Sequence, residues 1–499
     1  MNQFKYSFDN KRYHTLNYEL QKKFGCKVFK VSLNGGFTCP NIDGTKGFGG
    51  CIYCSKEGSG EFAGNKNKDL VTQFNEIKNK LEKKWPNSKY IAYFQANTNT
   101  YAPLNVLKEK YESVLTLPNV VGLSISTRPD SISDEVLDYL EELNKKTYLT
   151  VELGLQTIHE KTSKLINRCH SLKCFDEMVK KLHKRKIKIV VHIINGLPYE
   201  TKEMMLETIK HVNSLPIDGI KIHMLHILKN TPLEKLYKKE QFHILSKSEY
   251  ISIVCDQLEL LKDSIVINRI TGDPKSEDLV EPSWLVKKFS VLNDIDKELL
   301  RRNTYQGFKT SVLNKVRQLA ESVIKPKDLV VDATCGNGKD SLFLSNLVSE
   351  GHLFAFDIQK EAINNTNKLL KDNNKNNYTL FNCSHEFIGI KLKNYLGKIS
   401  FIVYNLGYLP NGDDSITTNY KSTIKSIKES LKLINKKGMI VLTVYPGHYE
   451  GFLESVKIKE FLKVLDDEFK AFEYHNTDNV IAPYVIYIKK SNYTIKKRH

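Results

Sequence analysis

Short apolar runs alternate with longer amphipathic stretches over the first 225 residues. The apolar runs predict strands at 27–33, 90–95, 120–126, 148–155, 187–194 and 219–225. Between them lie Lys- and Glu-rich stretches with helical spacing, such as "DLVTQFNEIKNKLEKKW". Strands that alternate with helices in this way indicate a parallel sheet, and this number of repeats predicts a partial or full (β/α) barrel. Residues 226–305 are expected to extend this domain, with a helix from 246 to 263.

A second alternating series begins after a boundary near residues 306–312. It starts with a helix and predicts strands at 329–334, 352–357, 378–382, 399–406, 438–445 and 482–490. This order is typical of a doubly wound, Rossmann-like α/β domain. We therefore predict an α/β protein with two domains, at residues 1–307 and 310–499.

Composition narrows the choice of partner and location. The 499 residues carry 75 Lys and Arg against 57 Asp and Glu, a formal net charge of +18. Such an excess favours a polyanionic partner, most simply a nucleic acid, although a general bias toward Lys, Asn and Ile is the alternative explanation. The chain has no run of 18 apolar residues and no basic-then-apolar leader, so we expect a cytoplasmic protein without a membrane partner.

Cys39, Cys51 and Cys54 form the tightest cysteine cluster, with the spacing C-x11-C-x2-C directly after the first predicted strand. A structural zinc site normally has four ligands in two close pairs, and a thioredoxin-like C-x-x-C motif needs no third cysteine. Cys26 is a candidate fourth ligand, but it precedes the strand and is expected at the opposite end of a barrel. Three thiolates without a fourth suit a [4Fe–4S] cluster with one open iron.

The segment "GGFTCPNIDGTKGFGGCIYCS" (35–55), with Tyr53 before the last cysteine, resembles the cluster loop of radical S-adenosylmethionine (SAM) enzymes. Its wide spacing is similar to that of the elongator-like branch, whose members modify tRNA. The resemblance implies a partial (β/α) barrel in which Cys39, Cys51 and Cys54 hold a [4Fe–4S] cluster and the open iron binds SAM. It also implies an external electron donor such as flavodoxin or ferredoxin. The resemblance continues to residue 307.

Polar motifs at the ends of the predicted strands supply candidate cofactor-binding residues, because a barrel carries its active site there. They are Gln95, Asn97, Arg128, Glu152 and Gln156. Glu152 and Gln156 offer polar groups to a nucleoside, and Arg128 offers a fork for a carboxylate. The Gly-Gly-Glu motif usual in the family is replaced by "QANTNT", where Gln95, Asn97 and Asn99 are the candidate substitutes. In the alternative interpretation, Glu152 is an ordinary strand-end charge and Arg128 holds a loop.

The second series opens with "LVVDATCGNGKDSLFL", a strand, a glycine loop and a helix. The loop lacks the spacing of a P-loop and of a full dinucleotide motif, but it fits a mononucleoside cofactor. Asp357 ends the next strand, where a carboxylate accepts ribose hydroxyls. This arrangement resembles the SAM-binding half of class I methyltransferases, which implies a second SAM site. Its candidate residues are Asp332, Thr334, Gly336, Gly338, Asp357, Gln359 and Asn405.

The string "NLGYLPNGDDSITT" (405–418) resembles the tRNA 5-aminomethyl-2-thiouridine methyltransferase family, earlier named as rRNA methylases. The resemblance implies catalytic roles for Asn405, Tyr408 and His448, and further roles for Asp413 and Thr417. Alignment of a neutral amine with the sulfonium is the main task in such a reaction. Pro446 and Tyr449 depart from the family pattern at the rim of the site.

Both resemblances together predict a bifunctional enzyme that modifies wobble uridine in tRNA. The C-terminal domain would methylate 5-aminomethyl(-2-thio)uridine with SAM, and the radical SAM domain would act on the same side chain, on its carboxymethylaminomethyl precursor. One alternative is a methyltransferase for rRNA or another nucleoside, fused to a radical SAM enzyme with a different substrate. An alternative of another class is a binding module whose iron–sulfur cluster serves as a sensor.

Overall fold

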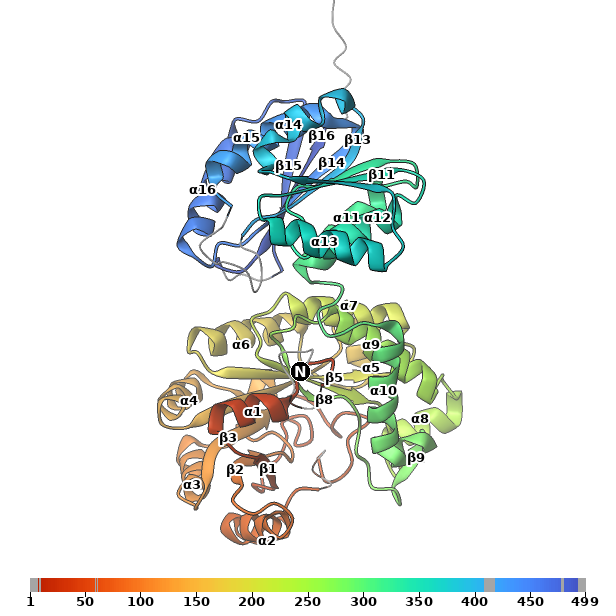
Figure 1. Cartoon of the computed structure of the whole chain (residues 1–499). Helices are drawn as coiled ribbons and strands as arrows, with labels where there is room; N and C mark the ends of the chain where they lie inside the picture. Colours follow the sequence, from red (N-terminus) through yellow and green to blue (C-terminus); the bar gives the residue numbers. More distant parts are fainter. Residues whose placement is uncertain are drawn as a thin grey trace, which may run out of the picture. The chain divides into compact units, whose positions relative to one another are not determined.

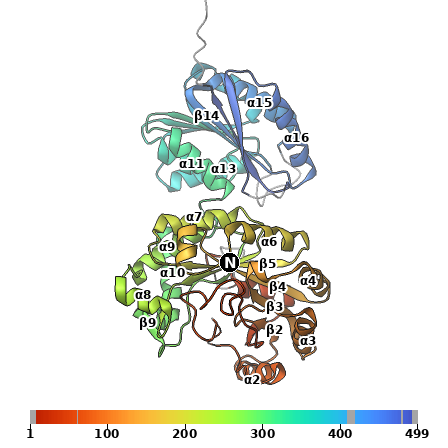
Figure 2. The ribbon, with the colours of Figure 1, turned by 180° about the vertical axis from the view of Figure 1, so that it is seen from behind.

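The computed structural model describes residues 8, 10–58, 60, 62–407, 418–476 and 480–491. The chain divides into two compact units, Met1–Phe308 and Lys309–His499 (Figure 1). Each unit is built on its own seven-stranded sheet (Figures 1 and 2). Among the described residues, no helix is long and apolar enough to cross a membrane.

The first unit contains an open parallel sheet with the order β1-β2-β3-β4-β5-β6-β8. Its strands are β1 (Val28–Leu33), β2 (Lys89–Phe94), β3 (Val120–Thr127), β4 (Tyr148–Gln156), β5 (Lys188–Asn195), β6 (Gly219–Met224) and β8 (Val266–Arg269). In this order β1 and β8 are the two edges, so the described strands form a partial barrel, as predicted. The strand β8 was not predicted, because its four residues "VINR" are too short and too mixed to stand out.

Helices follow the strands in turn and cover the outside of this sheet (Figure 1). Serine or threonine side chains cap several of them; Ser133, Ser171 and Thr201 each accept a backbone N–H at the start of a helix. The helices are α1 (Leu16–Phe24), α2 (Leu70–Glu82), α3 (Leu104–Leu115), α4 (Asp134–Lys146), α5 (Glu160–Leu165), α6 (Leu172–Lys184), α7 (Lys202–Asn213), α8 (Pro232–Glu240), α9 (Lys247–Leu260) and α10 (Lys288–Arg302). Two short strands, β7 (Ile227–Leu228) and β9 (Leu279–Glu281), pair separately.

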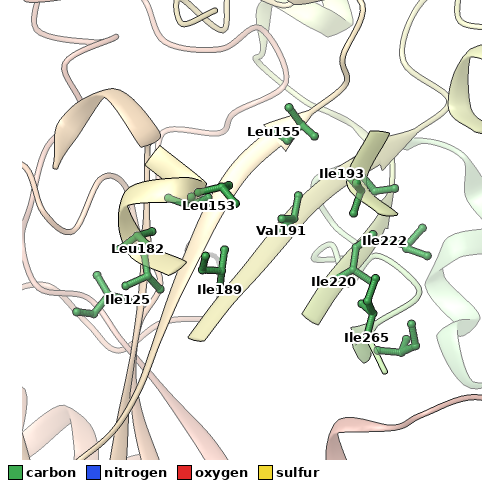
Figure 3. Packing of buried hydrophobic residues seen from close by; sticks show 14 of the residues in the cluster. Ile125, Leu153, Leu155, Leu182, Ile189, Val191, Ile193, Ile220, Ile222 and Ile265 are labelled. Carbon is green, nitrogen blue, oxygen red and sulfur yellow. The ribbon is translucent and has the colours of Figure 1, made fainter. Parts of the chain in front are cut away.

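The two faces of the first sheet differ in chemistry. Alternate residues of β4, such as Leu153 and Leu155, belong to the core together with Val191, Ile193 and Ile222 of the neighbouring strands (Figure 3). The residues between them on β4, Glu152, Gly154 and Gln156, line a cavity on the inner face. The apolar outer face therefore stabilises the sheet against its helices, and the inner face remains available for a site.

The second unit has the strand order β12-β11-β10-β13-β14-β16-β15, with β16 antiparallel to both of its neighbours. The strands are β10 (Leu329–Asp332), β11 (His352–Asp357), β12 (Tyr378–Asn382), β13 (Ile399–Asn405), β14 (Ile434–Val444), β15 (Phe469–Tyr474) and β16 (Tyr484–Lys490). This is the predicted Rossmann-like class I methyltransferase fold. The strand β15 was not predicted, and β14 begins four residues before the predicted position 438.

Helices cover both faces of the second sheet (Figure 1). One face packs against α11 (Val312–Val323), α12 (Lys339–Leu347) and α13 (Lys360–Asp372). The other packs against α14 (Ile388–Lys391), α15 (Tyr420–Leu433) and α16 (Tyr449–Lys463). Because both faces are covered, the central strands are almost continuously apolar, and this made them visible in the sequence.

Replacement of Leu153 by alanine tests how far the outer face stabilises the first unit. Leu153 is fully buried, so we expect Leu153→Ala to lower the free energy of unfolding by about 2–5 kcal/mol. The exposed Leu300 offers a matched control, for which Leu300→Ala should change this free energy by less than about 0.5 kcal/mol. Urea denaturation followed by circular dichroism measures both, and equal effects of the two variants would contradict this account of the core.

Candidate active sites

A cavity of about 290 Å³ lies at the carboxyl edge of the first sheet. The loop after β1 contributes the three clustered cysteines, Cys39, Cys51 and Cys54, to its lining. The other strands contribute every barrel residue proposed from the sequence, namely Gln95, Asn97, Arg128, Glu152 and Gln156. The predicted residues are thus brought to one place.

Contacts on both sides hold the cysteine loop in position. The Ile52 amide donates to the Ile166 carbonyl at 3.1 Å, and the Leu233 amide donates to the Ile52 carbonyl at 3.0 Å. Ile52 and Tyr53 also pack against a small apolar cluster that includes Leu225 and Leu233. The segment between Cys51 and Cys54 is therefore anchored by residues far from it in the sequence.

The surroundings of Cys51 favour its thiolate form. A hydrogen bond with Cys54 lowers the Cys51 pKa to about 6, aided by the Tyr53 hydroxyl, the Arg128 charge and the Asn41 amide, while burial opposes the shift. The Asn41 amide nitrogen lies 3.6 Å from the Cys51 sulfur. Because the thiolate is the form that binds metals, this environment suits a ligand role for Cys51.

The arrangement of thiols fits an iron–sulfur cluster better than a single metal ion. Among the described residues, no group of three His, Cys, Asp or Glu side chains is close enough together to hold one ion. A [4Fe–4S] cluster needs a different arrangement, because each thiolate binds a different iron atom. Cys39, Cys51 and Cys54 line one cavity, whereas Cys26 is not part of its lining. This distribution fits a cluster with three protein ligands.

Two arginines next to the cysteines hold loops through their own hydrogen bonds. The Arg128 fork donates to the Asp130 carboxylate, with distances of 2.9 Å from Nε and 2.8 Å from Nη2. A third nitrogen, Nη1, donates to the Arg168 carbonyl at 2.9 Å. Arg168 is buried and donates to the carbonyl oxygens of Leu155 and Thr157. The fork expected to meet a ligand carboxylate is thus occupied by Asp130, while the charge of Arg128 still acts on Cys51.

The remaining amide candidates lie at strand ends with unusual backbone conformations. Asn97 and Gln156 have positive φ angles of 61° and 60°. The Asn97 side chain donates to the Phe37 carbonyl at 3.0 Å, and the Asn97 amide donates to the Gly58 carbonyl at 3.0 Å. Asn97 therefore joins the end of β2 to the cysteine loop. Gln95 and Gln156 line the cavity beside it.

Glu152 is the centre of a buried network of charges that the sequence did not reveal. Its carboxylate accepts hydrogen bonds from Ser124 Oγ at 2.7 Å, His192 Nε2 at 2.7 Å and Tyr93 Oη at 3.0 Å. It also forms ion pairs with Lys221 and, at 2.6 Å, with Lys30. Burial would raise the Glu152 pKa, but the Lys221 and Lys30 charges and the His192 hydrogen bond hold it well below its ordinary value. We call Lys30, Tyr93, Glu152, His192 and Lys221 the floor network.

The second unit places its predicted SAM residues around the loop between β10 and α12. Asp357 accepts the Gly336 amide at 3.0 Å and the Gln359 amide at 2.9 Å, so its carboxylate faces this loop. Gly338 has a φ of 80°, and a Cβ atom there would lie 2.8 Å from the Thr366 Cα atom. Only glycine fits both constraints at this turn.

Asp332 and Asn405 meet at the same loop. Asp332 is buried and accepts from Ser341 Oγ at 2.6 Å and from the Thr334 amide at 3.3 Å. Burial, followed by the charge of Asp340, raises the Asp332 pKa to about 7. The Thr334 hydroxyl in turn accepts the Asn405 amide at 2.6 Å. A buried carboxyl group of this kind is suited to a cationic ligand such as SAM.

The Asn405 side chain is oriented by two residues that the sequence did not suggest. Asn405 Nδ2 donates to Asp340 Oδ2 at 2.6 Å, and Tyr445 Oη donates to Asn405 Oδ1 at 3.1 Å. Asp340 stands in the first turn of α12, directly after the glycine loop, which is a signal that could have identified it. Tyr445 directly follows β14 and carries no comparable sequence signal.

The other proposed catalytic residues have different outcomes. His448 is the N-cap of α16, where its Nδ1 accepts the Gly451 amide at 3.2 Å, so it has a structural task. Tyr408, Asp413 and Thr417 lie outside the described residues. Two residues depart from the family pattern at the rim of the site: Tyr449 is 77% exposed, and Pro446 is buried.

Comparisons with known proteins identify the family of the first unit. The family described as "Radical SAM superfamily" matches residues 45–212, and "Radical_SAM C-terminal domain" matches residues 217–301. The protein YtqA of Bacillus subtilis (strain 168) is 57% identical over 306 residues, which cover 61% of this chain and 95% of YtqA. The chain belongs to the YtqA family of radical SAM proteins. Elongator complex protein 3 of Bos taurus is 25% identical to it over 191 residues, covering 37% of this chain and 34% of that protein.

The remainder of the chain, beyond the part shared with YtqA, matches methyltransferases. The family described as "Putative rRNA methylase" matches residues 353–490. The chloroplastic tRNA (mnm(5)s(2)U34)-methyltransferase of Arabidopsis thaliana is 32% identical over 181 residues, covering 34% of this chain and 66% of that protein. Both resemblances found in the sequence are thus confirmed, and this member of the YtqA family is an enzyme that joins a radical SAM domain to a methyltransferase domain.

Replacement of Glu152 by glutamine tests the floor network. This change leaves Lys30 and Lys221 without their buried anion, so we expect the free energy of unfolding at neutral pH to fall by about 3–5 kcal/mol. Because the folded-state pKa of Glu152 is depressed, the same contribution is present at neutral pH and is lost as the pH falls through that pKa. Glu177→Gln, at an exposed position, is the control for urea denaturation. A loss no larger than in this control would contradict the role given to Glu152.

Proposed function

We propose that the protein is a bifunctional enzyme that modifies wobble uridine in tRNA. The C-terminal domain methylates the amine of 5-aminomethyl(-2-thio)uridine, and the radical SAM domain converts the carboxymethylaminomethyl precursor to that amine. The carboxymethyl group leaves as glyoxylate, whose aldehyde oxygen comes from water, and cleavage of SAM to 5′-deoxyadenosine and methionine takes up the two electrons. One observation carries the proposal: a chain with a radical SAM cavity continues into a domain that is 32% identical to a relative named for methylation at this tRNA position. Fusion of consecutive steps raises the local concentration of the intermediate.

The residues around Asn405 support methylation of an amine. Bound SAM supplies a methyl group on a sulfonium, and the protein must align a neutral amine with it. Hydrogen bonds with Asp340 and Tyr445 hold the Asn405 amide, and in this proposal its oxygen accepts a hydrogen bond from the amine. In the same proposal Asp357, which faces the glycine loop, binds the ribose of the cofactor, and the buried Asp332 attracts its positive charge.

The lining of the first cavity supports radical chemistry on the side chain of a bound nucleoside. A [4Fe–4S] cluster held in this cavity would supply an electron for the cleavage of SAM, with flavodoxin or ferredoxin as the external electron donor. Cys39, Cys51 and Cys54 are the residues that would hold the cluster. Asn97 fastens the cysteine loop to β2, and four members of the floor network, Tyr93, Glu152, His192 and Lys221, line the cavity.

The net charge of +18 is compatible with a tRNA partner, which would also place the protein in the cytoplasm. The description of the second family as an rRNA methylase favours a different nucleic acid as the second candidate substrate. Under that alternative, the modification would occur in rRNA and the wobble nucleoside would not change. Analysis of both RNAs from the same cells separates the two candidates.

Mass spectrometry of nucleosides from cells tests the proposal. In tRNA from cells with Asp332→Ala, we expect 5-aminomethyluridines to accumulate, because the methylation site is impaired. With Cys54→Ala, we expect the carboxymethylaminomethyl precursor to accumulate, because the cluster site is lost. Cys26→Ala, outside the cavity, should leave the nucleosides as in the wild type. An unchanged wobble uridine in both site variants would contradict the tRNA assignment.

The pH dependence of SAM binding tests the role of Asp332 separately. Because the Asp332 pKa is raised to about 7, its carboxyl takes up a proton below this pH and no longer attracts a cation. We expect SAM affinity to fall by up to about tenfold per pH unit below 7. Calorimetry on a protein with Cys54→Ala, in which the cluster site is lost, measures SAM binding to the methyltransferase domain alone. Asp332→Asn should remove the pH dependence. A SAM affinity that stays constant from pH 6 to 8 in the protein with Asp332 intact would contradict this role.

A further inference from the structure

Arg269 differs from the other two arginines that line the first cavity, Arg128 and Arg168, because its guanidinium has no partner among the described residues. It ends β8, lies half-buried and contributes to the cavity lining. Arg128 is paired with Asp130, and Arg168 donates to backbone carbonyls. The Arg269 backbone pairs with Lys221 of β6, but within the part of the chain that the structure describes its guanidinium has neither a hydrogen bond nor an ion pair. A guanidinium at the wall of a cavity without such a partner is ready to bind an anionic ligand.

The strands next to Arg269 add further positive charge. His192, Lys221 and Arg269 are register partners on β5, β6 and β8, so they form one row across the inner face. Lys221 is buried and donates to Tyr93 Oη at 3.0 Å as well as pairing with Glu152. The Lys221 pKa is lowered to about 7 by burial and by the charges of Lys30 and Arg269, while Glu152 opposes this shift.

The acidic groups that face this row do not neutralise its positive charge. Glu152 is already shared by Lys30, Lys221 and His192. Asp273 also lines the cavity, but it forms no ion pair with Arg269 in the described residues. His223, on the same inner face, is kept neutral because burial and the neighbouring His192 and Arg269 hold its pKa well below its ordinary value. Among the described residues, no carboxylate therefore pairs with the Arg269 guanidinium at this end of the cavity.

We propose that Arg269, backed by Lys221, binds the carboxylate of the substrate side chain and determines which wobble nucleoside the radical SAM domain accepts. This inference rests on the proposed function, in which the precursor carries a carboxymethyl group and the product does not. The planar guanidinium can bind both carboxylate oxygens. The amine is protonated in water in both the precursor and the product, but only the precursor also carries a carboxylate that offsets the repulsion by this row of cations. Arg269 thus retains the precursor and releases the product to the methyltransferase domain.

Enzyme kinetics on the full chain test this role. The substrates are SAM and tRNA that carries 5-carboxymethylaminomethyluridine, with a reductant for the cluster. We expect Arg269→Ala to raise the KM for this tRNA by about ten- to a hundredfold. Arg269→Lys, which keeps the charge without the fork, should recover part of this loss. Arg301→Ala is the matched control, since Arg301 is exposed and pairs with Glu298 on its own helix.

The KM for SAM distinguishes the two sources of a carboxylate. An Arg269→Ala variant with a raised KM for tRNA and an unchanged KM for SAM supports the inference. A raised KM for SAM alone would overturn it, because Arg269 would then bind the carboxylate of SAM. Unchanged values for both substrates would overturn it as well.

A binding measurement without turnover separates this inference from the proposed function. N-methylglycine imitates the end of the precursor side chain, and methylamine imitates the end of the aminomethyl product, which lacks the carboxymethyl group. In saturation-transfer NMR with the full chain, we expect N-methylglycine to bind to the wild type and not to Arg269→Ala, and methylamine to bind to neither. If the wild type does not convert the tRNA but this pattern holds, the proposed function fails and the carboxylate site stands. Equal binding of N-methylglycine to both proteins would overturn the site.

Discussion

The first unit depends on one buried negative charge, that of Glu152. Its carboxylate is reached by Lys30 on β1, Tyr93 on β2, Ser124 on β3, His192 on β5 and Lys221 on β6. A single side chain of β4 therefore ties together the inner faces of six neighbouring strands. Such an arrangement is stable only while every member keeps its partner, because an unpaired charge in this environment is costly. The shape of the cavity above it follows from this constraint.

The second unit uses buried carboxyl groups for a different purpose. Asp332 and Asp340 lie close enough to raise the Asp332 pKa, and no cation of the protein is bonded to Asp332 in the described residues. In the floor network, by contrast, lysines already neutralise Glu152. The Glu152 carboxylate thus has cationic partners within the protein and stabilises the fold, whereas the Asp332 carboxyl has none among the described residues and suits a positively charged ligand. The same residue types thus have opposite roles, and their partners decide which role applies.

The sequence predicted those strands whose outer residues form the core, because Leu153, Val191 and their neighbours produce clear apolar runs. It missed β8 and β15, which are short or at an edge and have mixed composition. Motif spacing identified the cysteines and Asp357, since their tasks depend on local geometry. It could not identify Lys30 or Lys221 as partners of Glu152, because these lysines come from strands that only the fold brings together. Arg269, on the strand that was missed, was overlooked for the same reason.

The central claim is that two SAM-dependent steps act in order on one side chain. Transfer of an isotopically labelled methyl group from SAM to purified tRNA tests it most directly. Starting from tRNA with the carboxymethylaminomethyl group, the account predicts one labelled methyl per wobble uridine with the wild type and none with Cys54→Ala. Starting from tRNA with the aminomethyl group, both proteins should transfer the label equally. Labelling of the carboxymethylaminomethyl tRNA by Cys54→Ala would contradict the account.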